Sequence, residues 1–284
     1  MSIIWGIPYL FIRVAVTEIT PATMVLWRTA IAAAILLPIA LARTDLRPVL
    51  ARWRWVVAFA AVEIAIPWVA LGSAEQHISS SLAGLLIAGV PLVGVAIALM
   101  TGGADRFGAA GLLGMLIGIA GVALIVGADF GTTDTTALVQ MGVVVVCYAL
   151  GPAILARKLD DLPTVAVMGV SLTLVAILFG PIGGSQWPAE TPSAEVLISV
   201  VVLATVCTAA AFLLFGALID LVGPVRATVT TYINPAVAAV LGVLVLNETF
   251  TVAMGIGFAL VIAGSVLATR PARTEALGPS PEPA

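Results

Sequence analysis

The sequence predicts an all-α integral membrane protein with ten transmembrane helices arranged as two inverted five-helix repeats. Three observations lead to this fold class: an apolar composition, ten apolar stretches near the length of a membrane span, and a match between the two halves of the chain. Of the 284 residues, 61% are hydrophobic and 10% are charged. Soluble domains carry about 25% charged residues, so this mixture cannot form a water-soluble surface and the bilayer must be the solvent.

The composition also excludes several classes of protein. The charged residues are few and segregated between the apolar stretches, and no basic stripe indicates a nucleic-acid partner. No Walker A motif is present, so ATP does not drive transport through this chain. The single histidine, His77, excludes a metal site with two histidine ligands. No catalytic constellation is visible, and we expect neither enzymatic activity nor a cofactor.

The ten apolar stretches follow one another between short polar segments. Each is a candidate helix, because a bilayer of about 30 Å needs about 20 residues to cross it. They lie near residues 1–16, 22–41, 55–72, 79–100, 109–126, 137–156, 164–182, 195–218, 227–246 and 251–269. The first stretch is short, so either that helix tilts into a thin region or the true start lies upstream of Met1. It lacks the features of a signal peptide and is expected to be a retained span.

The distribution of Lys and Arg predicts the orientation, because cytoplasmic loops carry an excess of these residues. With a cytoplasmic N-terminus, the inner segments hold Arg43, Arg47, Arg52, Arg54, Arg106, Arg157, Lys158, Arg226, Arg270 and Arg273. The outer segments hold no Lys, and their acids are Glu18, Glu75, Asp129, Asp134 and Glu190. We therefore expect a multi-pass protein of the cell membrane (plasma or inner) with both termini cytoplasmic. The polar, proline-rich tail over 271–284 is expected to be disordered.

The two halves of the chain match at an almost constant offset. The pairs 144 residues apart are Pro8/Pro152, Arg13/Arg157, Gly72/Gly216 and Pro91/Pro235, and those 143 apart are Asp105/Glu248, Phe107/Phe250, Gly114/Gly257 and Gly121/Gly264. The repeats cover residues 1–127 and 137–270. Each has five spans, an odd number, so the second must be inverted relative to the first. Inverted repeats with proline-interrupted helices at corresponding places indicate a secondary transporter that binds substrate near the midplane between the halves.

Four segments carry a family resemblance. They are "WGIPYLFIRVAV", "LWRTAIAAAILLP", "AEQHISSSLAGLLIAGVPLVGVAIAL" and "INPAVAAVLGVLVLNETFTVAMGIGFALVIAGSVL". Over nearly the whole chain, from Trp5 to about Arg270, the sequence resembles the EamA-type transporters of the drug/metabolite transporter (DMT) superfamily. The resemblance implies ten helices with both termini cytoplasmic, a central cavity walled by both repeats, and transport of amino acids, other metabolites or drugs. One departure is Asp105 in "GGADRF", where a glutamate is usual, and we interpret it as a conservative change at a helix junction.

Glu63 is an isolated acid about nine residues into the third span. At about 1.5 Å per residue it is about 13 Å deep, close to the middle of the hydrocarbon. An ionised acid there costs about 2.5 to 3.5 kcal/mol, so Glu63 must face water, pair with a cation or stay protonated. Functionally, it would anchor a substrate ammonium group or couple transport to protons; structurally, it would be a neutral, hydrogen-bonded carboxyl. Its repeat counterpart is Cys207, so only one half carries the acid.

Arg28, about six residues into the second span, is the candidate for an ion pair with Glu63. The alternative is that its side chain snorkels to the outer headgroups, which that depth permits. Arg13 is expected at the outer interface. Glu248, followed by Thr249, is expected to cap a helix junction.

A set of aromatic, proline and amide residues is predicted to line the substrate site with Glu63. The set is Trp5, Tyr9, Trp68, Pro91, Tyr148, Tyr232, Asn234 and Pro235. Pro91 and Pro235 free backbone carbonyls within spans four and nine, and such groups are tolerated only when buried in protein or lining water. For each aromatic residue the alternative is packing or anchoring at the interface. The substrate is expected between spans one, four, six and nine, with spans three and eight beside them.

Taken together, these features predict a secondary transporter that exports small metabolites such as amino acids, amines or amphipathic drugs by alternating access. Its partners would be a small-molecule substrate, membrane lipid and protons as the coupling ion. The alternative class is a channel-like pore or a membrane-embedded scaffold that transports nothing. Phosphorylated substrates are disfavoured, because only Arg13 and Arg28 place positive charge within the spans.

Overall fold

The computed structural model describes residues 1–100, 109–127, 134–222 and 233–269, and the regular structure in these ranges is helical. The helices before residue 128 are α1 (Ser2–Gly6), α2 (Pro8–Ala15), α3 (Pro21–Arg43), α4 (Arg47–Ala51), α5 (Trp53–Phe59), the π-helix η1 (Ala60–Ala65), α6 (Ile66–Glu75), α7 (Ser80–Ile87), α8 (Val90–Met100) and α9 (Ala109–Gly127). Those after residue 133 are α10 (Thr135–Lys158), α11 (Thr164–Ser185), α12 (Ala194–Ala204), the π-helix η3 (Thr205–Ala210), α13 (Ala211–Val222), α15 (Asn234–Leu246) and α16 (Val252–Ala268). The expected all-α class is confirmed.

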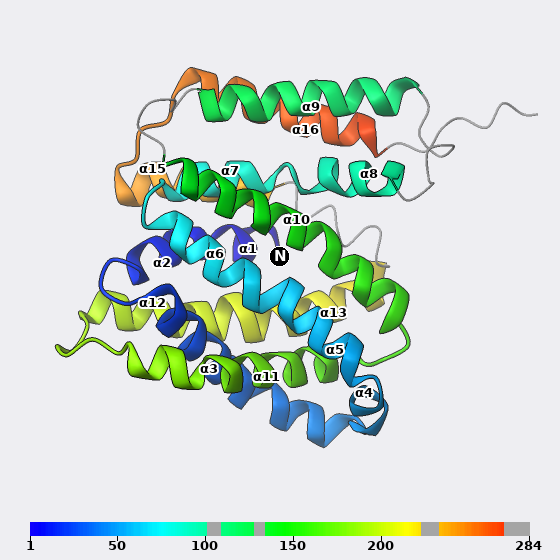
Figure 1. Cartoon of the computed structure of the whole chain (residues 1–284), viewed down its shortest axis with the longest axis vertical. Helices are drawn as coiled ribbons and strands as arrows, with labels where there is room; N and C mark the ends of the chain where they lie inside the picture. Colours follow the sequence, from blue (N-terminus) through cyan, green and yellow to red (C-terminus); the bar gives the residue numbers. More distant parts are fainter. Residues whose placement is uncertain (101–108, 128–133, 223–232, 270–284) are drawn as a thin grey trace, which may run out of the picture.

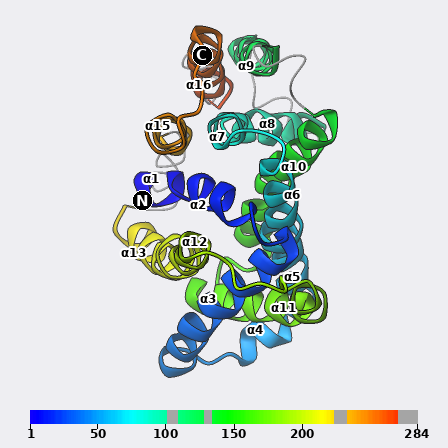
Figure 2. The same cartoon turned by 90° about the vertical axis from the view of Figure 1, so that its left-hand side faces the viewer.

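The helices run side by side along roughly one direction, which is horizontal in Figure 1. Turned by 90°, they form an elongated stack with α9 and α16 at one end and α3, α4 and α11 at the other (Figure 2). Helices α1 and α2 lie near the middle of this stack, and the first residue lies part-way along the helix direction (Figure 1). A side chain on α2 is therefore surrounded by protein on several sides.

Within the described ranges, seven helical segments are long and apolar enough to cross a membrane. They are Pro21–Arg43, Trp53–Glu75, Ser80–Ile97, Ala110–Gly127, Thr135–Lys158, Thr164–Ser185 and Ala194–Leu218. Three shorter apolar segments, Ser2–Ala15, Asn234–Leu246 and Val252–Ala268, fall on the other predicted stretches. Each of the ten apolar stretches thus contains a described helix, although three of these helices are shorter than a full span.

The two halves of the chain interlock instead of standing apart as two bundles. The most extensive helix contacts all join a helix before residue 128 to one after residue 133. The pairs are α9 with α16, α3 with α11, α6 with α10, α7 with α15, and α2 with α12. A site near the centre is therefore built from both halves.

Short polar side chains begin several helices, as expected of residues that satisfy the first free backbone N–H groups. The hydroxyls of Thr20, Ser79, Ser193 and Thr251 each accept a hydrogen bond from the backbone three residues later, at 3.1 to 3.4 Å. The C-terminal end of α15 is closed in a different way. Asn247, which follows this helix, adopts a left-handed conformation (φ 54°), which asparagine tolerates better than most residues. The following N–H, of Glu248, donates to the carbonyl oxygen of Gly242 at 3.1 Å and closes the helix end.

Helices α9 and α16 pack backbone against backbone, because glycines line the face that each presents to the other. A Cβ added at Gly114 would lie 2.7 Å from the carbonyl oxygen of Gly264, and one added at Gly121 would lie 2.6 Å from that of Gly257. Small residues permit this close approach in a bilayer, where packing replaces the hydrophobic effect. A shift of 143 residues maps Gly114 onto Gly257 and Gly121 onto Gly264, so the first contact maps onto the second.

Three segments depart from a regular α-helix near residues that the sequence marks. Helices α7 and α8 are separated by a turn at Ala88 and Gly89, just before Pro91, and the carbonyl of Ala88 accepts a hydrogen bond from Oγ of Ser265 at 3.5 Å. The π-helix η1 joins α5 to α6, and η3 joins α12 to α13. Single π-helical turns within α-helices are frequent at functional sites.

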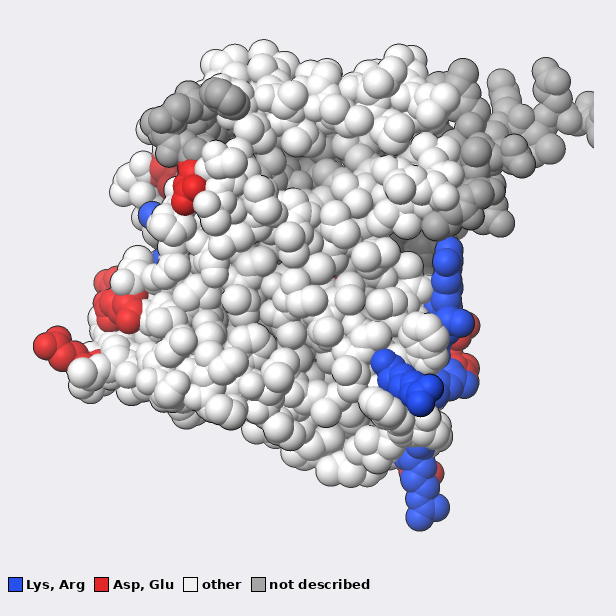
Figure 3. Space-filling model, in the orientation of Figure 1, with Lys and Arg blue, Asp and Glu red and all other residues white. Residues whose placement is uncertain are grey.

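Charged side chains gather at the two ends of the helices and leave a wide uncharged band between them. Lys and Arg lie mainly at the right-hand end of the face in Figure 3, and Asp and Glu mainly at the left-hand end. At the basic end, Arg52 binds Asp161 with two hydrogen bonds, which lower the pKa of Asp161. At the acidic end, the backbone N–H of Ser193 donates to Glu18 at 2.7 Å and lowers its pKa. Both contacts join the two halves.

Some predicted features lie outside the described residues. They are Tyr232, Asp105, Arg106, Asp129, Arg226, Arg270, Arg273 and the tail over 271–284.

Candidate functional site

Glu63 lies in η1, in the middle of the helical segment from Trp53 to Glu75. Its Oε2 atom is fully buried and hydrogen-bonds to no described residue. The side chain lies against Gly151 of α10, where an added Cβ would be 2.9 Å from the Glu63 Cδ atom. The glycine therefore makes the room that the carboxyl group occupies. A buried carboxyl group without donors is far less costly when protonated than when ionised.

Arg28 lies inside the bundle, with 5% of the residue exposed. Its Nε atom donates to Oγ1 of Thr208 in η3 at 3.0 Å. The guanidinium carbon lies 3.5 Å from the centroid of the Trp68 ring, which is a cation–π contact. The expectation that Arg28 snorkels to the headgroups is wrong, because α3 turns this residue toward α6 and η3.

The structure also corrects the predicted ion pair between Glu63 and Arg28. Among the described residues, the ion pair that forms is the one between Arg52 and Asp161. Thr208 and Trp68 hold the guanidinium from the side of η3 and α6, whereas the Glu63 carboxyl group lies against α10. Arg28 and the Glu63 Oε2 atom are both buried, but each has a different neighbour.

Two tyrosines complete a polar group around Arg28. The side chain of Trp68 hydrogen-bonds to Tyr148 of α10, and Arg28 interacts electrostatically with both Tyr148 and Tyr9. Tyr148 also interacts electrostatically with Glu63, so the same phenol is within electrostatic range of the arginine and the acid. Tyr9 comes from α2 and is 6% exposed. We call Tyr9, Arg28, Trp68, Tyr148 and Thr208 the central cluster.

The other predicted site residues lie elsewhere. Trp5 packs on α13, with its ring centroid 4.7 Å from that of Phe215 and 6.4 Å from that of Phe212. Asn234 and Pro235 are buried at the start of α15, a helix that contacts α1. Pro91 lies in α8, beyond the break that follows α7. The structure thus brings Tyr9, Glu63, Trp68 and Tyr148 together and places Trp5, Pro91, Asn234 and Pro235 on other helices.

Glu75 was expected in an outer loop, and the structure corrects this prediction. It is the last residue of α6, it is 0% exposed, and neither carboxyl oxygen hydrogen-bonds to a described residue. The predicted span ended at residue 72, whereas the helix continues for almost another turn. The signal that could have predicted the burial of Glu75 is the short connection between the two helices. The next helix begins at Ser80, so an acid at residue 75 has little room to reach solvent.

Glu248 caps a helix, as expected, but the helix belongs to the other half of the chain. Its two carboxylate oxygens accept hydrogen bonds from the backbone N–H groups of Ser80 and Ser81, at 2.8 and 2.9 Å. The Ser81 hydroxyl donates to the same carboxylate. A negative charge at a helix N-terminus is stabilising, so this acid fixes the start of α7 against the end of α15.

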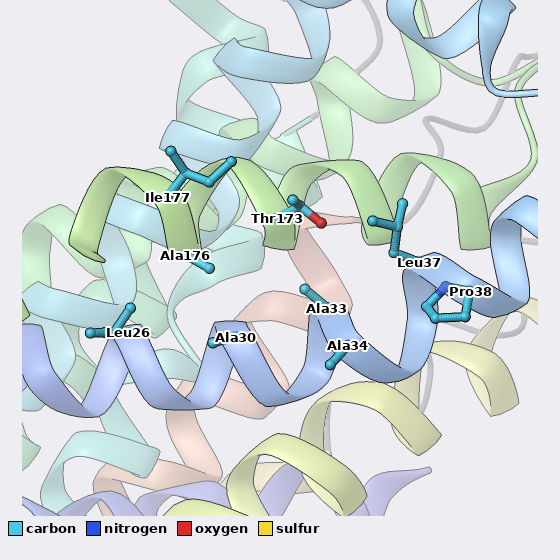
Figure 4. Close-up of a pocket in the computed structure, with 9 residues that line it drawn as sticks. All are labelled: Leu26, Ala30, Ala33, Ala34, Leu37, Pro38, Thr173, Ala176 and Ile177. Atoms are coloured by element: carbon cyan, nitrogen blue, oxygen red, sulfur yellow. The ribbon is translucent and has the colours of Figure 1, made fainter. Parts of the chain in front are cut away.

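Two cavities of about 410 Å³ each lie away from the central cluster. The first is an apolar groove between α3 and α11 (Figure 4), lined by Leu26, Ala30, Ala33, Ala34, Leu37, Pro38, Thr173, Ala176 and Ile177. The second lies at the basic end and is lined by Ala51, Arg52, Trp53, Arg54 and Trp55. Neither is lined by Glu63 or by a member of the central cluster, so neither is the expected central cavity.

Comparison with known proteins decides the family. Residues 1–127 and residues 135–270 each match the model of the EamA-like transporter family. The chain belongs to this family. The resemblance carried by the four sequence segments is thereby confirmed, and the EamA-like protein is a multi-pass membrane transporter with a small-molecule substrate.

Solved structures support the fold of this EamA-like transporter. Fifteen chains of solved structures match. One of them, described only as "Crystal structure of protein", is 22% identical and has a TM-score of 0.65, over 94% of this chain and 93% of its own. At that identity the likeness shows the fold alone. The comparison with curated proteins gave no match.

Proposed function

We propose that this EamA-like protein is a secondary transporter that exports small metabolites or drugs by alternating access, with Glu63 and the central cluster as its substrate site. The observation that carries this proposal is the Glu63 side chain on a π-helical turn between the halves, whose Oε2 atom is buried and has no hydrogen-bond partner among the described residues. Ionisable residues inside membrane spans mark substrate and ion pathways. A channel-like pore or an inert scaffold fits less well, because a pore would keep this acid wet and a scaffold would need no acid at this depth.

The contact pattern supports ten spans arranged as inverted repeats over 1–127 and 137–270. Exchanging the repeats turns spans one to five into spans six to ten. The contact between α2 and α12, of spans one and eight, then becomes the contact between α10 and α6, of spans six and three. The pairs α3–α11, α7–α15 and α9–α16 each map onto themselves. A two-fold axis relating the halves requires this pattern, and the family model also matches the chain twice.

The separation of charge supports a cytoplasmic basic end. The exposed Arg43, Arg47, Arg54, Arg157 and Lys158 lie in or next to the links that join α3 to α5 and α10 to α11. Figure 3 shows Lys and Arg gathered at one end of the helices, which the positive-inside rule assigns to the cytoplasm. With the repeat pattern, this orientation supports the expectation that both termini are on the cytoplasmic side of a plasma or inner membrane.

The side chains of the site suit an organic amine or an amino acid. The Glu63 carboxyl group would bind an ammonium group, and the rings of Tyr9, Trp68 and Tyr148 would contact an apolar or aromatic body. Substrate binding and proton release at Glu63 would then compete, because the acid accepts one positive charge at a time. Such competition couples export to an inward proton flux as the site opens to each side in turn.

Glu63→Gln tests this proposal, because glutamine matches the protonated acid in shape and cannot titrate. A growth-protection screen against amino acids and toxic amines would first identify a substrate, and proteoliposomes would then measure its transport. We expect Glu63→Gln to fold, to retain substrate exchange and to lose net transport driven by a pH gradient. Tyr9→Ala should weaken binding by about tenfold, which corresponds to roughly 1.4 kcal/mol, with little effect on expression.

The matched control is Glu190→Gln, which removes an exposed acid from a loop and should leave transport unchanged. Full pH-dependent export by Glu63→Gln would make Glu63 a structural carboxyl group and defeat the proton-coupling part of the proposal. If neither protection nor transport were seen for any compound with the parent protein, the transport proposal itself would fail.

A further inference from the structure

A second buried acid lies on the same helical segment, at the acidic end of the bundle. Glu75 follows Glu63 by twelve residues, or about 18 Å of helix at 1.5 Å per residue. It is 0% exposed, and both of its carboxyl oxygens lack a hydrogen-bond partner among the described residues. The hydroxyl of Ser80, at the start of the next helix, is also buried and without a partner there. Two unpartnered buried polar groups on neighbouring helix ends are costly to the fold, so their presence requires an explanation.

Arg13 shows which form of Glu75 this conformation holds. Its Nη1 atom donates to the backbone carbonyl oxygen of Glu75, although the carboxyl group of the same residue is within electrostatic range. A guanidinium is attracted to a carboxylate by its opposite charge and can bind it through two parallel hydrogen bonds, which a neutral carbonyl oxygen does not offer. An ionised Glu75 would therefore take Arg13 for its own side chain. The observed choice of the carbonyl is the one expected of a protonated acid.

Other charged and titratable groups face Glu75, and their charges act in opposite directions. They are Arg13 and Tyr9 of α2, Arg28 of α3, and Glu248 beyond α15. Both carboxylate oxygens of Glu248 already accept hydrogen bonds from the start of α7, so Glu248 holds a negative charge beside Glu75. A second negative charge next to Glu248 is therefore disfavoured, whereas the positive charges of Arg13 and Arg28 favour the ionised form of Glu75. The complete burial of its carboxyl group, with no hydrogen-bond donor among the described residues, favours the protonated form. The nearby guanidinium groups disfavour a metal ion in its place.

We propose that Glu75 is a proton-binding site whose protonation decides where Arg13 binds. With the proton bound, Arg13 holds the carbonyl at the end of α6 and ties α2 to that helix, as seen here. When Glu75 releases its proton to water, its carboxylate captures Arg13, the carbonyl loses its donor, and the contact between α2 and α6 at the acidic end loosens. The use of this switch in opening the acidic end rests on the proposed transport function, whereas the proton site itself does not.

Infrared difference spectroscopy of the purified protein after a pH change tests the proposal without a substrate. A protonated carboxyl group has its own C=O stretching band. We expect Glu75→Gln to remove one such band at neutral pH and Glu63→Gln to remove a different one. Glu190→Gln, an exposed acid at the same end, should remove none. Exchanging Na⁺ for K⁺ should leave the bands unchanged, and a sodium-dependent loss of the Glu75 band would mean a metal site and overturn the proposal.

Stability provides the second measurement. Glutamine replaces a neutral acid with little change, so Glu75→Gln should melt within a few degrees of the parent protein. If Glu75 were ionised and paired with Arg13, the same substitution would leave the half-buried Arg13 guanidinium without its counter-charge, and the variant would melt much lower or fail to fold. Either that result or an unchanged carboxyl spectrum in Glu75→Gln overturns the proposal. The band expected of Glu75 in the Glu63→Gln protein provides an independent check, whatever the outcome of the transport assays.

Discussion

The α9–α16 pair and the region of the two π-helices both join the halves of this EamA-like transporter, and they do so by opposite means. Between α9 and α16, the glycines bring one backbone directly against the other, at Gly114 with Gly264 and at Gly121 with Gly257. Around Arg28, which donates to Thr208 of η3, large side chains from both halves meet, among them Trp68 and Tyr148. The first contact has little freedom to rearrange, because its backbones already touch. The second contains side chains with alternative partners.

The difference indicates which contact is permanent and which one changes. Packed cores and interfaces adopt a few discrete arrangements and deform little between them. A glycine interface has one close-packed arrangement, so α9 and α16 would move as a unit. In the central region, one acid lacks any described partner and one guanidinium is held by a hydroxyl and an indole. Rearrangement there would exchange one set of weak partners for another.

The largest expected effect comes from breaking the permanent contact. A Cβ at Gly264 would collide with backbone atoms of Gly114 and Gly118, which cannot move aside as a flexible side chain can. We expect Gly264→Leu to cost more than about 3 kcal/mol and to abolish the folded protein, as measured by monodisperse yield and thermal unfolding. Gly142→Leu is the matched control, because nothing lies within 4 Å of a Cβ there. A stable Gly264→Leu protein would show that α9 and α16 can separate.

A smaller effect is expected where α10 meets η1. A Cβ at Gly151 would lie 2.9 Å from Cδ and 3.1 Å from Cβ of Glu63, so the acid would have to move. We expect Gly151→Ala to lower stability by about 1 to 2 kcal/mol and to lose most of that cost when Glu63→Ala is also present. Thermal unfolding of the two single variants and the double variant measures this coupling.

The control for this cycle is Gly142→Ala on the same helix, which should cost the same with and without Glu63. If the Gly151→Ala cost were also independent of Glu63, the carboxyl group would not lie against α10. The cycle of Gly151→Ala and Glu63→Ala measures how the two residues pack against each other. The comparison of Glu63→Gln with its Glu190→Gln control instead tests whether Glu63 titrates.

The same comparison explains how far the sequence alone could predict the structure. Composition and hydropathy predicted the helices, since a chain in a bilayer must satisfy its backbone within each helix. Proline predicted the break before Pro91. The distribution of Arg and Lys predicted which ends would gather positive charge. These features depend on local chemistry and need no knowledge of which helices touch.

The partners of the buried charges could not be predicted in this way. Glu63 and Arg28 are the two charges inside neighbouring spans, and pairing them was the simplest hypothesis. The structure instead places Thr208, 180 residues away in the sequence, against Arg28. Glu75 was missed because a helix end is uncertain by a few residues, and burial there depends on which helix covers it. Such contacts follow from the packing of the two halves, which one sequence does not reveal.

The smallest expected effect lies at the basic end, where Arg52 joins the halves through the link after α10. Its hydrogen bonds lower the pKa of Asp161 below the ordinary value of about 3.8, so the folded protein binds fewer protons than the unfolded chain as the pH falls. Above the ordinary pKa of about 3.8, which applies to the unfolded chain, the Arg52–Asp161 pair therefore contributes its full stabilisation. This contribution is lost as the pH drops through the lower pKa that Asp161 has in the folded protein. Both side chains are largely in water, so the effect is modest and weakens with salt.

We expect Asp161→Asn to melt slightly below the parent protein at neutral pH and to converge with it in acid. Asp160→Asn, which removes an exposed acid next to it that has no ion pair in the described structure, should melt closer to the parent protein than Asp161→Asn does at neutral pH. A difference for Asp161→Asn that grew as the pH fell would contradict the assigned direction. An effect as large as that of Gly264→Leu would place this solvent-exposed link among the permanent contacts. The contrast between a glycine interface that cannot move and polar contacts that can would then have to be abandoned.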